Sequence, residues 1–226
     1  MFQWDYYNKL LYNFSLEENN NNNNNLIPKQ NRVYNIINNL PKTWKVSFKI
    51  NPTTNNNNNQ LTNIIHFTTQ YDNGIQGSRT PAVWFMPNSR RLKISSSLAD
   101  NYDHTFEMSE DLPSNTYTEI EIEQFKNQYS SRNGDYIYRI TVAGKQVHRV
   151  MNEDPREFKN VKMYVSSPWY EPADVVIKDL KLDAPYYEVE QKQGRWYLFI
   201  HPCFGVPAKS APVKRPGEEW VTAAGV

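Results

Sequence analysis

The stretch that decides the fold is Gly77-Ser-Arg-Thr-Pro-Ala-Val-Trp-Phe-Met-Pro-Asn-Ser-Arg-Arg-Leu-Lys-Ile-Ser-Ser-Ser97. A Gly-X-Arg-X-Pro turn leads into a short apolar run, Ala82–Met86, and a Pro-Asn-Ser turn follows it. Residues Leu92–Ser96 then alternate between apolar and polar side chains, the period of two that a half-buried strand produces. Two such runs joined by turn residues predict a β-hairpin.

Segments of the same kind flank this hairpin on both sides. Tyr117–Phe125 places Ile120 and Ile122 on one face of a strand and three glutamates on the other. The full set of expected strands is Val33–Leu40, Trp44–Ile50, Leu61–Thr69, Ala82–Met86, Leu92–Ser96, His104–Met108, Tyr117–Phe125, Tyr136–Val142, Gln146–Val150, Val161–Val165 and Val175–Leu182. Short strands separated by Pro, Gly, Asn and Asp turns, with no convincing long helix among them, predict an all-β sandwich.

Composition excludes several classes of protein. The 226 residues carry 25 Lys and Arg against 24 Asp and Glu, so no net field favours a nucleic acid or an anionic membrane surface. No apolar run is long enough for a membrane span, and the first residues do not have the form of a signal peptide. The single cysteine, Cys203, cannot form an internal disulfide, which favours a reducing compartment.

Low-complexity runs suggest the boundaries of the domain. Asn19–Asn25 and Asn55–Asn59 are runs of asparagine alone, which are typical of inserted loops. We expect an N-terminal arm with a poly-Asn linker over residues 1–32, the sandwich over residues 33–183, and a C-terminal extension with a Pro-rich tail over residues 184–226. The arm is rich in aromatic and apolar side chains, so we expect it either to add a strand to its own sandwich or to dock on another subunit.

Several of these strands resemble a known family. Leu40-Pro-Lys-Thr-Trp-Lys-Val-Ser-Phe-Lys-Ile-Asn-Pro-Thr53, Tyr117-Thr-Glu-Ile-Glu-Ile-Glu123 and Ile140-Thr-Val-Ala-Gly-Lys-Gln-Val147 resemble strands and a hairpin of concanavalin A-like, laminin-G-like lectin domains. The resemblance extends over roughly residues 33–183. It implies a jelly-roll sandwich of two antiparallel sheets, an extracellular setting, and a glycan or protein ligand bound by the rim loops, frequently with a calcium ion.

Three carboxylates on one strand are candidates for catalysis. Glu119, Glu121 and Glu123 share one strand face, and the pattern resembles the Glu-X-Asp-X-Glu signature of jelly-roll glucanases, in which the outer pair are nucleophile and acid/base. The central position holds Glu121 where that family has Asp. A polar strand face opposite Ile120 and Ile122 explains the same pattern without chemistry, and we favour it.

Loop residues are the better candidates for a binding site. The loops Tyr71–Arg79, Ala99–His104 and Pro168–Ala173 combine oxygen donors, a guanidinium and aromatic rings, the groups that hydrogen-bond and stack on sugars. The expected ligand-binding residues are Asp72, Asn73, Arg79, Tyr102, Asp103, Trp169 and Tyr170, and Asp100 with Asp103 would hold calcium. Trp44 and Trp84 are expected in the core. The histidines His66, His104, His148 and His201 show no zinc spacing and are expected to be ordinary strand or loop residues.

The sequence therefore predicts a non-enzymatic recognition or adhesion module that binds a glycan or glycoprotein through its rim loops. The alternative is a structural subunit of a larger assembly that self-associates through its terminal arms. A jelly-roll glycoside hydrolase that uses Glu119 and Glu123 comes third. No nucleic-acid partner and no membrane span are expected.

Overall fold

A computed structural model describes residues 25–53, 58–127, 129 and 135–184, together with the backbone of four strands outside these ranges. The first of those strands is β1 (Phe14–Ser15), and the others, β14 (Tyr186–Lys192), β15 (Arg195–His201) and β16 (Lys209–Pro212), form a three-stranded antiparallel sheet. The contacts expected of the terminal arms otherwise concern residues outside the described part of the chain.

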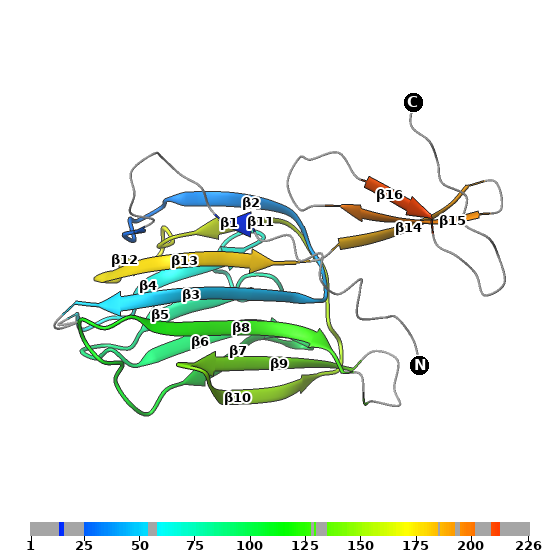
Figure 1. Ribbon diagram of the computed structural model, residues 1–226. Coiled ribbons are helices and arrows are strands. Elements are labelled where there is room, and N and C mark those ends of the chain that lie inside the picture. Colours follow the sequence, from blue (N-terminus) through cyan, green and yellow to red (C-terminus); the bar gives the residue numbers. More distant parts are fainter. Residues whose placement is uncertain are drawn as a thin grey trace.

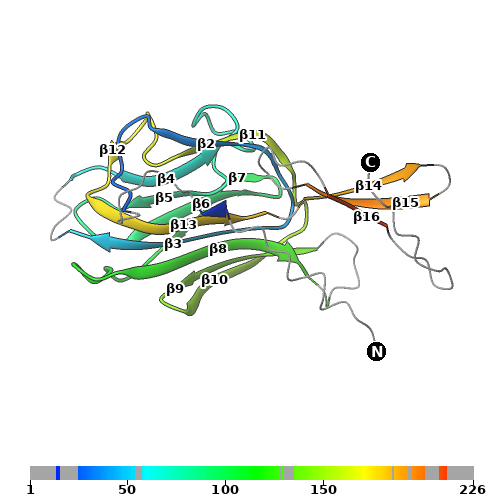
Figure 2. The same ribbon diagram turned by 45° about the horizontal axis from the view of Figure 1, so that its top comes forward.

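Two sheets lie face to face and form the body of the molecule (Figures 1 and 2). Sheet A has the strand order β1, β13 (Val175–Asp183), β3 (Trp44–Pro52), β8 (Thr118–Lys126), β9 (Tyr136–Val142) and β10 (Lys145–Asn152). Sheet B has the order β2 (Val33–Leu40), β11 (Phe158–Tyr164), β4 (Thr62–Thr68), β5 (Ala82–Phe85), β6 (Leu92–Leu98) and β7 (Asn101–Glu107), with the short β12 (Glu171–Pro172) beside β4. All pairings are antiparallel except that of β12 with β4. The predicted two-sheet antiparallel jelly-roll sandwich is confirmed.

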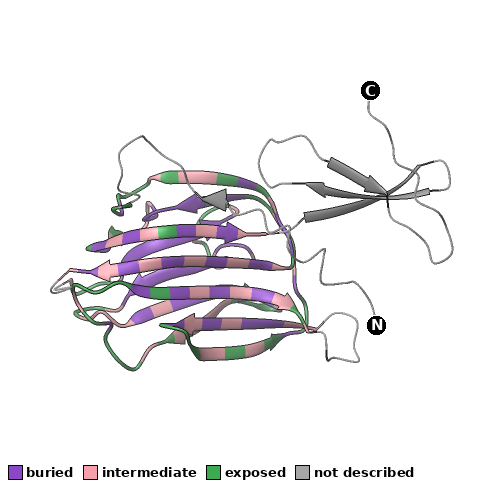
Figure 3. Ribbon diagram, in the orientation of Figure 1, coloured by how far each residue is buried: buried purple, intermediate pink, exposed green. Residues whose placement is uncertain are grey.

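The strands of sheet A have one buried and one solvent-facing side, as Figure 3 shows for β3 and β8. Val46 lies opposite Ile122 and Phe48 opposite Ile120, and all four side chains are buried in the core between the sheets. Residues between them in sequence point outward, because successive side chains of a strand alternate between its faces.

Sheet B differs, because its central strands are covered on both faces. Every residue of β4 and β5 is buried, including the polar His66 and the large Trp84. Their neighbours Phe67 and Val83 belong to the core between the sheets, so His66 and Trp84 face the opposite side. Loop residues 69–81 and 165–173 cover that outer side, as shown by the contact of His66 with Ser78 and of Asn63 with Ser167.

Each of the eleven expected strands is present, with ends that differ by up to a few residues. The hairpin that opened the sequence pairs Ala82 with Ser95 and Phe85 with Leu92. At the turn between β9 and β10, Ala143 and Gly144 both have positive φ, the conformation a tight hairpin turn requires. The two-residue β12 was not expected, since a strand that short has no detectable period.

The N-terminal arm contributes one strand to sheet A. This strand, β1, pairs with β13, with Phe14 opposite Leu182.

Within the described residues there is no helix of the length and apolar character needed to cross a membrane.

Candidate functional site

Two loops and the edge strand β7 meet over the outer face of sheet B. The loop between β4 and β5 folds back on the sheet at Gly77, whose φ of +86° is unfavourable for residues with a side chain. A Cβ at Gly77 would lie 2.8 Å from the Thr69 hydroxyl, so glycine is required there for close packing. The Gly77 amide donates to Ser97 Oγ on β6, and its carbonyl accepts from the Thr69 amide. This closure brings Asp72, at the start of the loop, beside Arg79 at its end.

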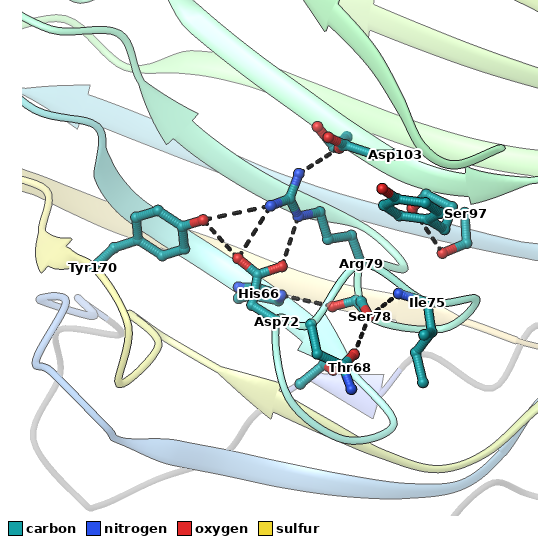
Figure 4. A network of polar contacts seen from close by, with 12 residues as sticks. His66, Thr68, Asp72, Ile75, Ser78, Arg79, Ser97, Asp103 and Tyr170 are labelled. Atoms are coloured by element: carbon teal, nitrogen blue, oxygen red, sulfur yellow. Dashed lines mark hydrogen bonds and ion pairs between the residues drawn. The ribbon is translucent and has the colours of Figure 1, made fainter.

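Arg79 is the centre of a hydrogen-bonded cluster (Figure 4). Its Nε donates to Asp72 Oδ1 at 2.8 Å and its Nη2 to Asp72 Oδ2 at 3.1 Å, a bidentate pair. Its Nη1 donates to the carboxylate of Asp103 on β7. The hydroxyl of Tyr170 donates to Asp72 Oδ2 at 2.5 Å and lies 3.4 Å from Arg79 Nη2. Four side chains from two loops and the strand β7 thus form one connected group, which we call the Arg79 cluster.

Burial makes the charges of the Arg79 cluster strongly interdependent. The side chain of Asp72 is 6 % exposed, and that of Arg79 is 17 % exposed. Burial alone would raise the pKa of Asp72, but the hydrogen bonds from Arg79 and Tyr170 outweigh it and lower that pKa. Burial likewise opposes the charge of Arg79, but Asp72 and Asp103 together raise its pKa. Burial, with the hydrogen bond to Asp72, raises the pKa of Tyr170 to about 12, so its hydroxyl is protonated at neutral pH.

His66 lies beneath this cluster on β4 and is fully buried. Its Nε2 lies 2.8 Å from the Ser78 carbonyl oxygen (Figure 4). A carbonyl can only accept, so Nε2 carries the proton and Nδ1 is the acceptor nitrogen. That Nδ1 has no hydrogen-bond partner among the described residues. Burial lowers the pKa of His66 to about 4, so the ring is neutral at pH 7.

Aromatic rings pack against the side chains of the Arg79 cluster. Trp84 lies 5.7 Å from the His66 ring and 5.4 Å from the Tyr170 ring, both in edge-to-face geometry, and the Arg79 guanidinium lies 5.1 Å over the Trp84 ring. The neighbouring Trp169 has edge-to-face contacts with three rings, those of His66, Tyr71 and Tyr164. Because the rings of Trp169 and Tyr170 are both held by other rings, their orientation is fixed before any ligand binds.

A hollow of about 300 Å³ opens beside these two rings. Its described lining consists of Gln30, Gln60, Leu61, Trp169, Tyr170 and Glu171. The volume is at the small end of the range for ligand pockets. Tyr170 is therefore shared, since it is a lining residue of the hollow and its hydroxyl belongs to the Arg79 cluster.

The structure brings together most of the residues expected to bind a ligand. Asp72, Arg79, Asp103 and Tyr170 form the cluster, and Trp169 adjoins it. The expected Asn73 instead has a local role, since its Oδ1 accepts from Ser78 Oγ. The Tyr102 ring packs against Gly74, and 44 % of this residue is exposed.

The two aspartates expected to hold calcium have different partners. The Asp100 carboxylate, which is fully exposed, pairs with Arg156, and the Asp103 carboxylate pairs with Arg79. Within the described ranges no three His, Cys, Asp or Glu side chains are grouped as metal ligands would be. Calcium binding at Asp100 and Asp103 stays a prediction.

The three glutamates of β8 lie on the outer face of sheet A, away from the Arg79 cluster. Glu121 pairs with Lys45, and Arg139 donates to Glu123 from Nε at 2.7 Å. Glu119 is exposed. Ion pairs with neighbouring strands thus account for two of the three carboxylates.

From the sequence we did not predict His66, the outer-face position of Trp84, or three polar residues of the hollow. His66 and Trp84 were expected as ordinary strand and core residues, but both belong to the covered outer face of sheet B. Polar residues alternating with Ile65 and Phe67 on β4 were the available signal. Gln30, Gln60 and Glu171 lie far apart in the sequence and gave no signal.

No family model and no curated protein sequence matches the chain. Similar solved structures include a heptameric SAP-like pentraxin from Limulus polyphemus, with 9 % identity, 67 % of this chain and 69 % of that chain covered, and a TM-score of 0.42. An endo-β-1,4-glucuronan lyase from Trichoderma reesei has 9 % identity, covers 66 % and 72 %, and has a TM-score of 0.41. An alginate lyase in complex with alginate tetrasaccharide has 11 % identity, covers 66 % and 72 %, and has a TM-score of 0.45.

These comparisons correct two of our expectations. Solved structures similar to this chain include alginate and glucuronan lyases as well as a pentraxin and a botulinum neurotoxin receptor-binding domain. The expectation that the chain is not an enzyme is therefore wrong. The predicted function is wrong for the same reason. It named a non-enzymatic recognition or adhesion module, with a structural subunit or a glycoside hydrolase as alternatives, and left out polysaccharide lyases. What the chain shares with these proteins is the jelly-roll sandwich.

Proposed function

We propose that this chain is a carbohydrate-active enzyme that cleaves an acidic polysaccharide by β-elimination, with Tyr170 as the residue that moves the proton. The observation that carries the proposal is the contact of the Tyr170 hydroxyl with both the Asp72 carboxylate and the Arg79 guanidinium, at the edge of a hollow. A concanavalin A-like ancestry, as the strand sequences suggested, is part of the same proposal.

Elimination makes three demands on a site. A base must take the proton from the ring carbon that bears the carboxylate, an acid must protonate the glycosidic oxygen as its bond to carbon breaks, and a cation must neutralise the carboxylate so that the carbanion can form. The proton lost from carbon can be the proton gained by the leaving oxygen. One phenol placed near both atoms can therefore serve as base and as acid.

Tyr170 and Asp72 supply the proton transfers. In the resting structure the Tyr170 hydroxyl donates to Asp72 and accepts from Arg79 Nη2, which leaves one lone pair of the Tyr170 oxygen for the substrate proton. As Tyr170 Oη takes the proton from carbon, its own proton passes to Asp72 Oδ2. The proton then returns from Asp72 while Oη protonates the leaving oxygen, so both side chains end as they began. The adjacent Arg79 charge opposes the burial that makes the phenolate costly.

Arg79 supplies the positive charge. Its Asp72 side is nearly closed, whereas the Asp103 side chain on the other side is 36 % exposed. A uronate carboxylate would thus reach the guanidinium by displacing the more exposed Asp103 carboxylate from Nη1. Arg79 stays charged throughout, because both aspartates raise its pKa.

The test is formation of the unsaturated sugar that elimination leaves, measured by ultraviolet absorbance. The polymers to use are alginate, glucuronan and gellan. The first two appear in the names of the similar lyases, and in gellan glucuronate is joined to neutral sugars. We expect at least one to be cleaved, with Tyr170→Phe lowering kcat by about 100-fold or more, the usual contribution of an acid–base group. Tyr102→Phe is the matched control and should retain activity, since Tyr102 lies outside the Arg79 cluster. Folded protein that yields no unsaturated product from any of the three polymers, or a fully active Tyr170→Phe variant, would overturn the proposal.

A further inference from the structure

The hollow beside Tyr170 is built differently from the Arg79 cluster. Its described lining residues are two aromatic residues, two glutamines, a leucine and a glutamate, with no lysine or arginine. It therefore offers stacking surfaces and hydrogen-bonding groups but no positive charge for an acidic ligand.

The two rings of the hollow are held rigidly. Trp169 is held by edge-to-face contacts with His66 at 5.3 Å, Tyr164 at 6.0 Å and Tyr71 at 6.5 Å. Tyr170 is held by Trp84 and by its hydrogen bond to Asp72. Fixed rings lose little conformational entropy when a ligand binds, and an aromatic face is a surface on which the apolar face of a sugar ring packs.

The polar groups come from three separate segments. Gln30 lies in the loop before β2, and its amide nitrogen contacts the Pro168 carbonyl at 3.3 Å. Gln60 lies in the loop before β4, and Glu171 begins β12. The side-chain carboxylate of Glu171 accepts hydrogen bonds from hydroxyl groups, but it repels another carboxylate across so small a space.

We propose that this hollow is a subsite for an uncharged sugar residue, adjacent to the uronate held by Arg79. The inference rests on the proposed function, and it names the substrate class as a heteropolysaccharide in which uronate and neutral sugars are joined. Trp169 and Tyr170 stack on the neutral ring, Gln60 and Gln30 hydrogen-bond its hydroxyls, and Glu171 excludes a second uronate. A homopolymer of uronate would then bind with one residue poorly accommodated.

Direct binding tests the subsite without any cleavage. Calorimetric titration of the full chain with cellobiose, mannobiose, lactose and digalacturonate compares neutral with acidic disaccharides. We expect at least one neutral disaccharide to bind about tenfold more tightly than digalacturonate. Gln60→Ala should weaken that binding by about threefold to tenfold, as loss of one hydrogen bond does. Glu171→Gln should reduce the difference in affinity between neutral and acidic disaccharides.

The outcomes separate this inference from the proposed function. Tyr170→Phe removes the hydroxyl that moves the proton and should abolish cleavage, whereas Gln60→Ala leaves the Arg79 cluster intact and should weaken the binding of the neutral disaccharide. Neutral binding that responds to Gln60→Ala, in a protein that cleaves none of the polymers, would refute the lyase and retain the subsite. Digalacturonate binding as tight as neutral binding, no neutral binding, or no effect of Gln60→Ala and Glu171→Gln would overturn the subsite. Cleavage of alginate at least as efficient as that of gellan would also contradict it.

Discussion

The outer faces of the two sheets carry similar side chains in different surroundings. On sheet A, Lys45 and Glu121 form an ion pair whose side chains are 34 % and 28 % exposed. On sheet B, Arg79 and Asp72 form one whose side chains are 17 % and 6 % exposed. Both faces also place a guanidinium over an aromatic ring, Arg139 over Phe125 and Arg79 over Trp84. Water reaches the side chains on sheet A, whereas two loops cover those on sheet B.

That difference decides which face can do chemistry. Exposed ion pairs are screened by water and contribute little to stability. Covered groups depend on each other, and their pKa values shift, as those of Asp72, Tyr170 and His66 do. The glutamates of β8 resemble a catalytic motif in sequence, but the residues that the fold covers and brings together lie on the other sheet.

The largest expected difference between the faces is in the cost of removing an aromatic ring. Trp84 is 1 % exposed, so Trp84→Ala should lower the free energy of unfolding by about 3–5 kcal/mol. Phe125→Ala removes the matched ring beneath Arg139 on the half-buried face of sheet A and should cost about 1 kcal/mol. Urea denaturation of both variants measures the two values, and equal values would show that the two faces are equally covered.

His66 should make the stability of sheet B depend on pH. Its pKa is about 4 when folded and 6.5 when unfolded, so below pH 6.5 the unfolded chain binds a proton that the folded chain does not. The contribution of His66 to the free energy of unfolding should therefore be constant above about pH 7 and fall by about 3 kcal/mol as the pH drops to 4. The pH at which stability is lost should move lower in His66→Gln, which keeps a donor for Ser78. The same pH dependence in this variant and in wild type would assign it to other groups.

Breaking one ion pair on each face gives a smaller contrast. Arg79→Met leaves the nearly buried Asp72 carboxylate without its cation and should cost about 2–3 kcal/mol, somewhat less than for a fully buried pair. Lys45→Met breaks the exposed pair and should cost at most about 1 kcal/mol. Thermal unfolding at low and high salt compares them. A larger loss for Lys45→Met would reverse the distinction between the two faces.

The smallest effect is expected for the glutamates of β8. Glu119→Gln combined with Glu123→Gln should leave polysaccharide cleavage within about twofold and stability within about 1 kcal/mol, because these side chains form the polar face of a strand. The activity assay with the three polymers measures this directly. Loss of cleavage in this variant, with Tyr170→Phe still active, would move the site to sheet A.

Some of this was available from the sequence because it depends on local patterns. Alternation in β3 and β8 identified the core residues Val46, Phe48, Ile120 and Ile122. The three loops chosen for their oxygen donors and rings do supply Asp72, Arg79, Asp103 and Tyr170 to one cluster. His66 was passed over because a single histidine in a strand has no spacing to interpret.

What the sequence by itself determined was the two-sheet sandwich, since period-two alternation and turn residues act over a few neighbouring positions. Only the tertiary structure decided which polar face is covered, because Gly77 closes one loop over sheet B and the segment from Ser167 to Tyr170 closes another. Those contacts join residues up to 104 positions apart. Burial by distant segments leaves no mark on local periodicity, and it is burial that separates the Arg79 cluster from the exposed pairs of sheet A.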